Sequence, residues 1–216
     1  MRATAQAQPN IALIKYWGKR DAGRNLPAVS SLSLTLESLW TRMTVEFDRA
    51  LESDRLKLNG EVASDLLPRI SRCLDLVAGK NRARAAVTSE CNFPIAAGLA
   101  SSASSFAALV VAASDAAKIK MDTLTLARLA GAVSGSAARS LYPGIVLLRA
   151  DDRDILVETI AKDWPLELVV AVTDESAKAV SSSVAMLRSA ATSPFYDAWV
   201  EQQEQDIATA LAAVRS

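Results

Sequence analysis

Residues 94–105 read Pro-Ile-Ala-Ala-Gly-Leu-Ala-Ser-Ser-Ala-Ser-Ser, and they place a glycine turn directly before an expected helix over 101–117. The first turn of that helix would hold only small residues. Free backbone N–H groups and the helix dipole attract phosphate at such an end, and small side chains let the phosphate approach. No Gly-Lys-Ser/Thr follows, so the stretch is not a Walker loop. On composition alone, an Ala/Ser-rich helix packed against a sheet is an equal alternative.

A second cluster, residues 10–21, reads Asn-Ile-Ala-Leu-Ile-Lys-Tyr-Trp-Gly-Lys-Arg-Asp. Three cations (Lys15, Lys19 and Arg20) and two aromatic side chains surround one glycine after a short apolar strand. Lysines held there suit a polyanionic ligand as point charges. Taken alone, a solvated turn whose aromatics cover the edge of the core is the better interpretation.

A third cluster, residues 134–142, reads Ser-Gly-Ser-Ala-Ala-Arg-Ser-Leu-Tyr. Two serines flank a glycine, and Arg139 follows one helical turn after Ser136. This spacing can bring two hydroxyls and a guanidinium to one anion. The alternative, favoured when the segment is taken alone, is an ordinary capped helix with a surface arginine.

Composition limits the possible chemistry. The 216 residues include 24 Lys plus Arg and 24 Asp plus Glu, so no global field favours nucleic acid or an acidic membrane. The absence of histidine excludes Ser-His-Asp and Cys-His catalysis and most zinc designs. The two cysteines have no metal or disulfide-framework spacing, and no apolar run spans a bilayer. We therefore expect a cytoplasmic protein with no nucleic-acid or membrane partner.

The hydrophobic pattern predicts a mixture of helices and strands without a regular βαβ repeat, which indicates an α+β fold. Asn59-Gly60 predicts a tight turn, Ser64 a helix cap, Asp122 another cap, and Ser193-Pro194 the start of a last helix. That helix has an apolar stripe with no later element to cover it, so we expect association or low solubility. Strands are expected over residues 32–36, 43–47, 84–91, 144–148 and 166–173. Helices are expected over residues 64–79 and 101–117, and a turn at 151–152.

Together these segments resemble the diphosphomevalonate decarboxylase family of the GHMP kinase superfamily. The resemblance rests on residues 10–21, 26–36, 92–104 and 134–142, in the family's order, and it extends over essentially the whole chain. It implies a GHMP kinase-like α+β fold. Residues 1–165 would form the ribosomal protein S5 domain 2-like N-terminal domain with the ATP phosphate loop, and residues 166–216 the start of an incomplete α+β C-terminal domain.

The resemblance also implies an activity. The intact enzyme would use ATP and Mg²⁺ to phosphorylate the 3-hydroxyl of mevalonate 5-diphosphate. Loss of phosphate and carbon dioxide would then give isopentenyl diphosphate, in the mevalonate pathway of isoprenoid biosynthesis. The implied assembly is a homodimer. The alternatives are a related GHMP enzyme acting on mevalonate or its monophosphate, or an inactive truncated domain that only binds ligands.

Site residues follow from the resemblance, position by position. Arg139 is expected on the substrate carboxylate, and Ser102 on Mg²⁺ or the γ-phosphate. The substrate-binding residues are expected to be Lys15, Tyr16, Trp17, Gly18, Lys19, Arg69, Ser134, Gly135, Ser136, Ala137, Ala138, Arg139, Ser182, Ser183 and Met186. The ATP-binding residues are expected to be Pro94, Ala96, Ala97, Gly98, Leu99, Ala100, Ser101 and Ser102.

The chain departs from the family pattern at several positions. Some members of the family have arginine where Ser183 stands, which predicts a weaker grip on the diphosphate. Glycines usual in the family are replaced at Ser105, Val133, Pro143 and Ala185.

The largest departure concerns the catalytic residue. The family's catalytic aspartate lies in a C-terminal Asp-Ala-Gly-Pro-Asn segment, and residues 1–216 do not contain that segment. We therefore expect the aspartate to lie beyond Ser216, and the resemblance assigns no catalytic residue within the chain. It follows that this chain alone is expected to be a poor catalyst.

Overall fold

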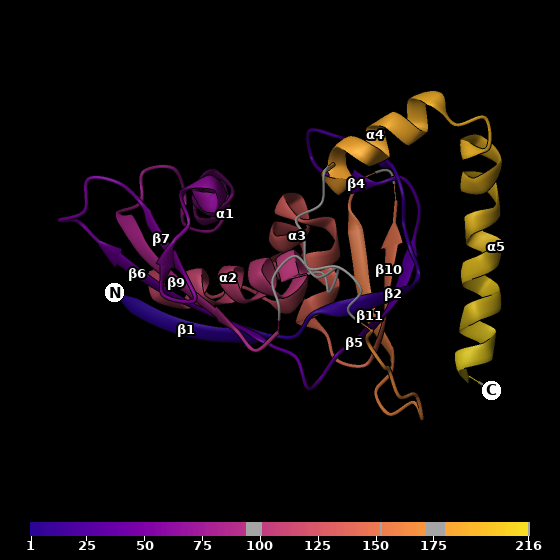
Figure 1. Cartoon of the computed structure of the whole chain (residues 1–216), viewed down its shortest axis with the longest axis horizontal. Coiled ribbons are helices and arrows are strands. Elements are labelled where there is room, and N and C mark those ends of the chain that lie inside the picture. Colours follow the sequence, from indigo (N-terminus) through magenta and orange to yellow (C-terminus); the bar gives the residue numbers. More distant parts are fainter. Residues whose placement is uncertain (94–100, 152, 172–179, 216) are drawn as a thin grey trace.

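Two antiparallel-rich sheets enclose a helical layer in this computed structural model, which describes all residues except 94–100, 152, 172–179 and 216. Figure 1 shows the larger sheet and α1 at one end of the molecule, α5 at the other, and α2 and α3 between them. The mixture of elements confirms the expected α+β class. The larger sheet has the order β1 (Arg2–Ala7), β6 (Thr41–Asp48), β9 (Arg84–Cys91), β7 (Arg55–Leu58) and β8 (Glu61–Val62).

The smaller sheet lies beside the predicted ligand-binding segments and has the order β11, β10, β5 and β2. Its strand β5 pairs antiparallel with both β10 and β2. A short hairpin of β3 and β4 follows β2 along the chain. The bounds are β2 (Asn10–Ile14), β3 (Lys19–Asp21), β4 (Leu26–Pro27), β5 (Ser31–Thr35), β10 (Ile145–Ala150) and β11 (Ile155–Ala161).

Helix α2 forms the centre of the core because its small side chains allow close approach from several directions. Ala103, Ala107 and Ala112 are fully buried, and the helix contacts β1, β6, α1 and the 3-10 helix η2. No helix in the described part of the chain is long and apolar enough to cross a membrane. The helices are η1 (Ser64–Leu66), α1 (Leu67–Ala78), α2 (Ser101–Ala117), α3 (Thr123–Val133), η2 (Gly135–Leu141), α4 (Ser182–Thr192) and α5 (Tyr196–Arg215).

Several local predictions are confirmed. Asn59 and Gly60 both have positive φ, 47° and 90°, and they form the turn of the β7–β8 hairpin. This is the backbone that Asn-Gly favours in a two-residue hairpin loop. Asp122 accepts a hydrogen bond from the Thr125 N–H at 2.7 Å and so caps α3.

Three local predictions are wrong. Ser64 makes no capping bond; it lies in η1, and α1 begins at Leu67 with Pro68 in its first turn. The last helix begins at Tyr196 rather than at Ser193, because Ser193 instead ends α4. The expected strand over 166–173 does not form across its described residues, 166–171, because no neighbouring strand among the described residues pairs with it.

The apolar stripe of α5 is covered, contrary to the expectation of an uncovered face. Ile207 and Leu211 are 2% and 8% exposed, and they pack with Leu32, Ile145 and Leu147 of the smaller sheet. Phe195, which was expected at the start of this stripe by its helical spacing, instead precedes the helix and is 78% exposed. The covering surface comes from strands that lie far earlier in the sequence, so the sequence pattern alone did not reveal it.

Candidate functional site

A cavity of about 590 Å³ opens where the β2–β3 connection, α1, η2 and the first turn of α4 meet. These segments are far apart in the sequence and were predicted separately. The cavity brings together twelve of the predicted substrate and nucleotide residues. They are Lys15, Tyr16, Lys19, Arg69, Ser102, Ser134, Gly135, Ser136, Arg139, Ser182, Ser183 and Met186.

Arg139 lies at the inner wall of this cavity and is only 2% exposed. Its Nε donates to Ser33 Oγ at 2.9 Å, and its other nitrogens donate to Ser31 Oγ and to Asn10 Oδ1. All three partners are neutral, and burial lowers the pKa of Arg139 to about 10, so it remains charged at neutral pH. A buried guanidinium held by neutral groups is prepared for an anionic partner.

Asn10 holds the base of the site together, although the sequence analysis did not assign it a role. Its Nδ2 donates to Ser136 O at 3.0 Å and to Ser140 Oγ at 2.7 Å, while its Oδ1 accepts from Arg139. The side chain is buried at 3% exposure and lines the cavity. Its position at the first residue of the segment 10–21 was the signal that could have identified it.

Tyr16 and Gly135 form a close contact on the cavity wall. A Cβ at Gly135 would lie 2.0 Å from the Tyr16 hydroxyl oxygen, so the tyrosine occupies the space that glycine leaves open. Burial raises the pKa of Tyr16, which keeps the hydroxyl protonated and able to donate a hydrogen bond. The contact explains why a glycine stands between Ser134 and Ser136.

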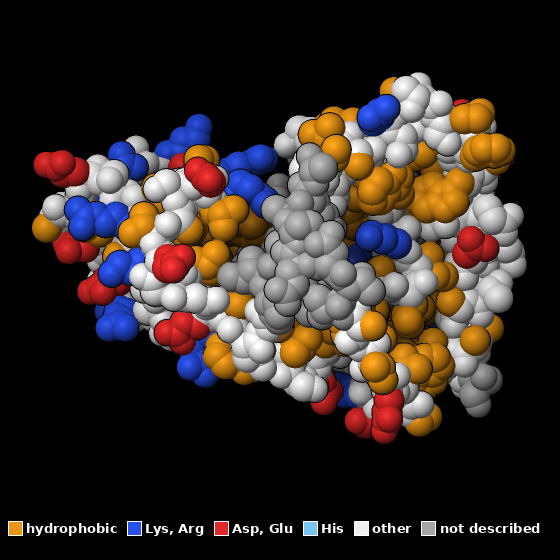
Figure 2. Space-filling view, in the orientation of Figure 1, with side chains coloured by type: hydrophobic (Ala, Val, Ile, Leu, Met, Phe, Trp, Pro, Cys, Tyr) orange, Lys and Arg blue, Asp and Glu red, His pale blue; other side chains and the backbone are white. Residues whose placement is uncertain are grey.

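Three further cations, Lys19, Arg69 and Arg72, gather along the cavity wall. Lys19 Nζ donates to Ser183 Oγ at 3.1 Å, and Arg69 lies over the Phe106 ring at 4.7 Å and donates to Val133 O. Burial, then Arg72 and Arg69, lower the pKa of Lys19; burial, then Arg72, lower the pKa of Arg69. Arg72 was not predicted from the sequence. Figure 2 shows basic side chains gathered over α1 on the side that faces α4.

The charge of the cavity is one-sided. Lys15, Lys19, Arg69, Arg72 and Arg139 line it, and among its described lining residues there is no Asp or Glu. Like charges held close together repel one another, and a bound polyanion removes that repulsion. The arrangement is therefore suited to a ligand with several negative charges, which can meet both Arg139 and the cluster of Lys19, Arg69 and Arg72.

The expected phosphate loop meets this cavity at Ser102. Ser134 Oγ donates to Ser102 Oγ at 3.4 Å, so the first turn of α2 joins the wall formed by η2. Ser101 is the first residue of α2, while Pro94, Ala96, Ala97, Gly98, Leu99 and Ala100 lie outside the described residues. Mg²⁺ takes oxygen ligands and commonly shares nucleotide phosphates; the Ser102 hydroxyl fits one such position.

Four of the residues predicted to bind the substrate do not line this cavity. Trp17 instead lines a neighbouring cavity of about 600 Å³ with Tyr196 and Trp199. Gly18 has φ +103°, and a Cβ there would meet the Tyr196 hydroxyl at 1.8 Å, so it is required for backbone geometry and packing. Ala137 and Ala138 are fully buried in the hydrophobic core. They follow the serine pair along the motif, but the turn of η2 points them away from the ligand space.

The catalytic aspartate was expected beyond Ser216, and this stays a prediction. Ser216 itself lies outside the described residues. The described residues that line the cavity supply cations, hydroxyls and an amide but no carboxylate. We therefore assign binding roles to the residues of this site and no catalytic acid or base.

The family profile described as the diphosphomevalonate decarboxylase-like N-terminal domain matches residues 7–158. The diphosphomevalonate decarboxylase of Candida albicans is 38% identical over 219 residues, which are 90% of this chain and 60% of that protein. The diphosphomevalonate decarboxylase of Saccharomyces cerevisiae is 39% identical over 222 residues, 92% of this chain and 56% of that protein. The chain thus spans little more than half the length of these relatives.

Solved structures of mevalonate diphosphate decarboxylases are also similar to this chain. The mevalonate diphosphate decarboxylase of Staphylococcus aureus superposes with a TM-score of 0.84 at 36% identity, over 99% of this chain and 68% of the other. A structure described as MDDEF in complex with MVAPP, AMPPCP and magnesium has a TM-score of 0.86 at 34% identity, over 99% and 68% of the two chains. These similarities confirm the predicted GHMP kinase-like fold.

Proposed function

Because the chain belongs to the diphosphomevalonate decarboxylase family, we propose that it serves the ATP-dependent conversion of mevalonate 5-diphosphate to isopentenyl diphosphate. The observation that supports this most directly is the distribution of charge in the cavity. Mevalonate 5-diphosphate has a carboxylate at one end and a diphosphate at the other. Arg139 and a separate cluster of Lys19, Arg69 and Arg72 line the cavity, with no carboxylate among the described lining residues.

Each end of the substrate has a proposed set of partners. Arg139 receives the carboxylate, and the hydroxyls of Ser134 and Ser136 orient the carbon chain. Lys19 and Arg69 bind the diphosphate as charge-assisted donors, because such bonds are about twice as strong as neutral ones. Tyr16 lies beside Gly135 and Arg139, so it adjoins the carboxylate. Lys15 completes the diphosphate side, and Ser182, Ser183 and Met186 close over it from α4.

ATP and Mg²⁺ are the proposed partners of the substrate in the reaction. Residues 94–102 would wrap the nucleotide phosphates, and Ser102 would offer an oxygen to the metal or to the γ-phosphate. Support comes from the similar MDDEF complex, which contains AMPPCP and magnesium. When bound, Mg²⁺ neutralises phosphate charge during transfer to the 3-hydroxyl.

The reaction suits residues that position and neutralise charge. Phosphoryl transfer depends on alignment and electrostatic stabilisation more than on covalent catalysis, so it needs no histidine. Arg139 and the serines hold the tertiary hydroxyl in place while Lys19 and Arg69 fix the diphosphate. Departure of the phosphate from C3 then builds positive charge at that carbon, which the departing phosphate and the surrounding dipoles stabilise. Loss of carbon dioxide supplies the electron pair that forms the double bond.

Thermal unfolding with three ligands tests the proposed substrate. A ligand stabilises the folded protein by an amount that grows with its concentration over Kd, about 2.7 kcal/mol at a hundredfold excess. We expect mevalonate 5-diphosphate to raise the Tm most, mevalonate 5-phosphate less, and mevalonate least. A larger shift with mevalonate or with the monophosphate would instead favour a related enzyme of the same superfamily.

Three further proposals concern the protein as a whole. The division into residues 1–165 and 166–216 stays a prediction, as do the cytoplasmic location and the homodimer. Sedimentation velocity at several concentrations tests the dimer. A single species at the monomer mass across that range would reject it.

A further inference from the structure

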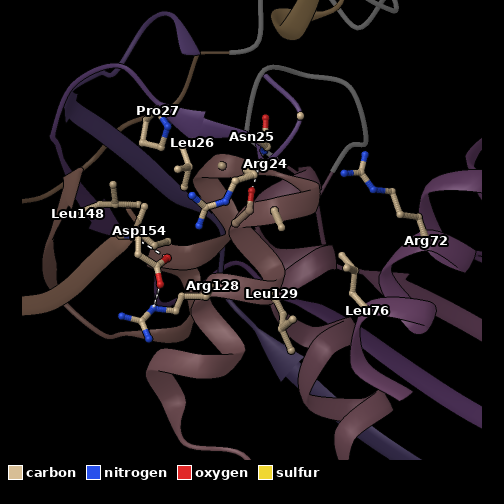
Figure 3. A pocket seen from close by; sticks show the side chains of 15 residues that line it. Arg24, Asn25, Leu26, Pro27, Arg72, Leu76, Arg128, Leu129, Leu148 and Asp154 are labelled. Atoms are coloured by element: carbon tan, nitrogen blue, oxygen red, sulfur yellow. Dashed lines mark hydrogen bonds and ion pairs between the residues drawn. The ribbon is translucent and has the colours of Figure 1, made fainter. Parts of the chain in front are cut away.

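A second chamber, of about 390 Å³, lies beside the substrate cavity between the β3–β4 hairpin, α1 and α3. Figure 3 shows Leu26 and Leu148 on one side of it and Arg72 and Leu76 of α1 on the other, with Leu129 of α3 below. Ile155 completes the apolar wall. Leu26, Leu148 and Ile155 are buried, whereas Leu76 is 41% exposed at the rim.

The charges around this chamber are mostly satisfied by protein groups. Arg128 Nε lies 2.7 Å from Asp154 Oδ2, an ion pair that is visible in Figure 3. Arg24 donates to the carbonyl oxygen of Arg153. Arg72, in contrast, forms no ion pair among the described residues. Arg24 has no ion pair among these residues either, but of the two only Arg72 also lines the substrate cavity.

The chamber and the substrate cavity share part of their walls. Asn25, Arg72, Ala132 and Gly135 line both. Asn25, which has a φ of 58°, donates from its side-chain amide to Gly131 O at 2.7 Å and so holds the hairpin against α3. One ligand can therefore place a charged group on the Lys19, Arg69 and Arg72 cluster and an apolar chain among the leucines.

We propose that this chamber binds the hydrocarbon chain of an alkenyl diphosphate whose diphosphate occupies the Lys19, Arg69 and Arg72 cluster. The diphosphate half of this inference rests on the proposed function. The substrate has a hydroxyl and a carboxylate that would lose their hydrogen bonds against Leu26 and Leu129, which is costly, so it lies toward Arg139 instead. An alkenyl chain lacks both groups and gains affinity by leaving water.

The same cations serve both ligands, so the alkenyl diphosphate competes with mevalonate 5-diphosphate. Longer chains fill more of the chamber and compete better. Each buried methylene contributes about a fourfold gain in affinity. This gives the site a means of responding to the diphosphate esters that lie downstream of its own product class.

Titration calorimetry of the full chain with inorganic diphosphate, isopentenyl diphosphate and geranyl diphosphate tests the proposal. We expect affinity to rise along this series, by at least about tenfold from the first to the last. Leu76→Gln should remove most of that gain and leave the affinity for inorganic diphosphate unchanged. Leu66→Gln is the matched control, because Leu66 is similarly exposed, at 43%, and lines neither cavity.

The possible outcomes separate this inference from the proposed function. The proposal that this chamber binds the hydrocarbon chain is overturned if affinity does not rise with chain length. It is also overturned if the gain in affinity persists in Leu76→Gln. In that case binding of mevalonate 5-diphosphate would still support the proposed function. If neither inorganic diphosphate nor mevalonate 5-diphosphate binds, both proposals fail together. Circular dichroism of each variant checks that the fold is retained.

Discussion

Arg139 is a charged side chain in the protein interior, where burying a charge costs free energy. Its hydrogen-bond partners show how the site is organised before a ligand binds. Asn10, Ser31 and Ser33 satisfy its hydrogen bonds without neutralising it. Their hydroxyls and amide come from β2 and β5, so the smaller sheet fixes the guanidinium before any substrate arrives. The fixed donors need no reorganisation on binding, which favours affinity and alignment.

Arg72→Gln should reduce the preference for a diphosphate over a monophosphate. Arg72 adds a third cation to Lys19 and Arg69, and a charge-assisted contact contributes about 1.5–3 kcal/mol, or roughly tenfold or more in affinity. We expect at least tenfold weaker binding of mevalonate 5-diphosphate and less than about threefold for mevalonate 5-phosphate. Calorimetry of both ligands measures the ratio.

The control for this variant is Arg55→Gln, since Arg55 is an exposed cation on β7 outside the cavity. It should change neither affinity. Equal losses of affinity for mevalonate 5-diphosphate and mevalonate 5-phosphate in Arg72→Gln would contradict the prediction for that variant. They would show that Arg72 does not bind the second phosphate group specifically.

Residues at this scale were predictable where a motif contained them and missed where only the fold places them. Arg139 and Lys19 were assigned through the family resemblance of their segments, because each segment taken alone favoured an ordinary structural role. Arg72 reaches the site because it lies about one helical turn after Arg69 on the same face of α1. The neighbouring sequence does not predict which face of that helix lines the cavity. Trp17 was assigned to the substrate through the family resemblance of its segment, but adjacent side chains point in different directions, and Trp17 lines the neighbouring cavity.

At the scale of elements, α5 is attached to the smaller sheet through a few large side chains. Ile207 and Leu211 lie against Leu32 and Ile145, and the helix otherwise has few buried residues. The amphipathic pattern predicted that the helix buries one face. It could not predict which surface covers that face, because the covering strands are distant in sequence.

Ile207→Ala should destabilise the protein by about 2–5 kcal/mol, because it removes a fully buried side chain and leaves a cavity. Leu187→Ala on α4 is the control, since Leu187 is 50% exposed and should change stability by less than about 0.5 kcal/mol. Urea unfolding followed by circular dichroism compares the two. Similar losses in both variants would contradict the packing of α5 on the sheet.

An ion pair ties the end of α1 to the start of strand β7. Arg82 donates two hydrogen bonds to Asp54, at 2.8 and 2.6 Å, and its Nε lies 2.9 Å from Asp75 on α1. Burial alone would raise the pKa of Asp54, but bonds from Arg82, Ser71 and Ala85 lower it from 3.8 to about 2. Asp54 and Arg82 side chains are only 5% and 3% exposed, so solvent screens the pair weakly.

This lowered pKa predicts a pH dependence of stability. A carboxylate whose pKa is depressed on folding stabilises the protein above its unfolded pKa, and that stability is lost as pH falls through the folded pKa. The shift of Asp54 from 3.8 to about 2 corresponds to about 2 kcal/mol. The difference in unfolding free energy between wild type and Asp54→Asn should be largest above pH 4 and shrink by that amount toward pH 2. A difference independent of pH would contradict the ion pair's role.

The segment 166–171 shows where pattern alone misleads at this scale. Alternating apolar residues predict a strand, yet Leu166, Leu168 and Val170 are about 40% exposed and the segment has no regular structure. A strand is stable only when its backbone groups pair with a neighbour. An alternating apolar pattern indicates that a segment could pair as a strand. It does not indicate whether a neighbouring strand is available, and none of the described residues pairs with this segment.

At the scale of the whole molecule, the site exists because two sheets and a helical layer bring four distant segments to one place. The β2–β3 connection and η2 adjoin strands of the smaller sheet, and α1 comes between β8 and β9 of the larger sheet along the chain. The first turn of α4 completes the cavity lining, and Figure 1 shows how these elements are arranged. The four-segment resemblance identified the family and its fold from the sequence. The chamber beside the cavity could not be predicted, because it depends on how α1, α3 and a short hairpin pack.

The central claim is that one cavity binds mevalonate 5-diphosphate by its two charged ends, separately from the nucleotide. Calorimetric titration of wild type, Lys19→Ala and Arg139→Ala with mevalonate 5-diphosphate and with an ATP analogue tests it most directly. Lys57→Ala, an exposed cation on β7, is the control, and circular dichroism confirms that each variant is folded. We predict that both cavity variants lose roughly tenfold to a hundredfold in affinity for mevalonate 5-diphosphate, with less than about a threefold change for the ATP analogue. Equal losses for the two ligands, or unchanged binding of mevalonate 5-diphosphate in both variants, would contradict the account.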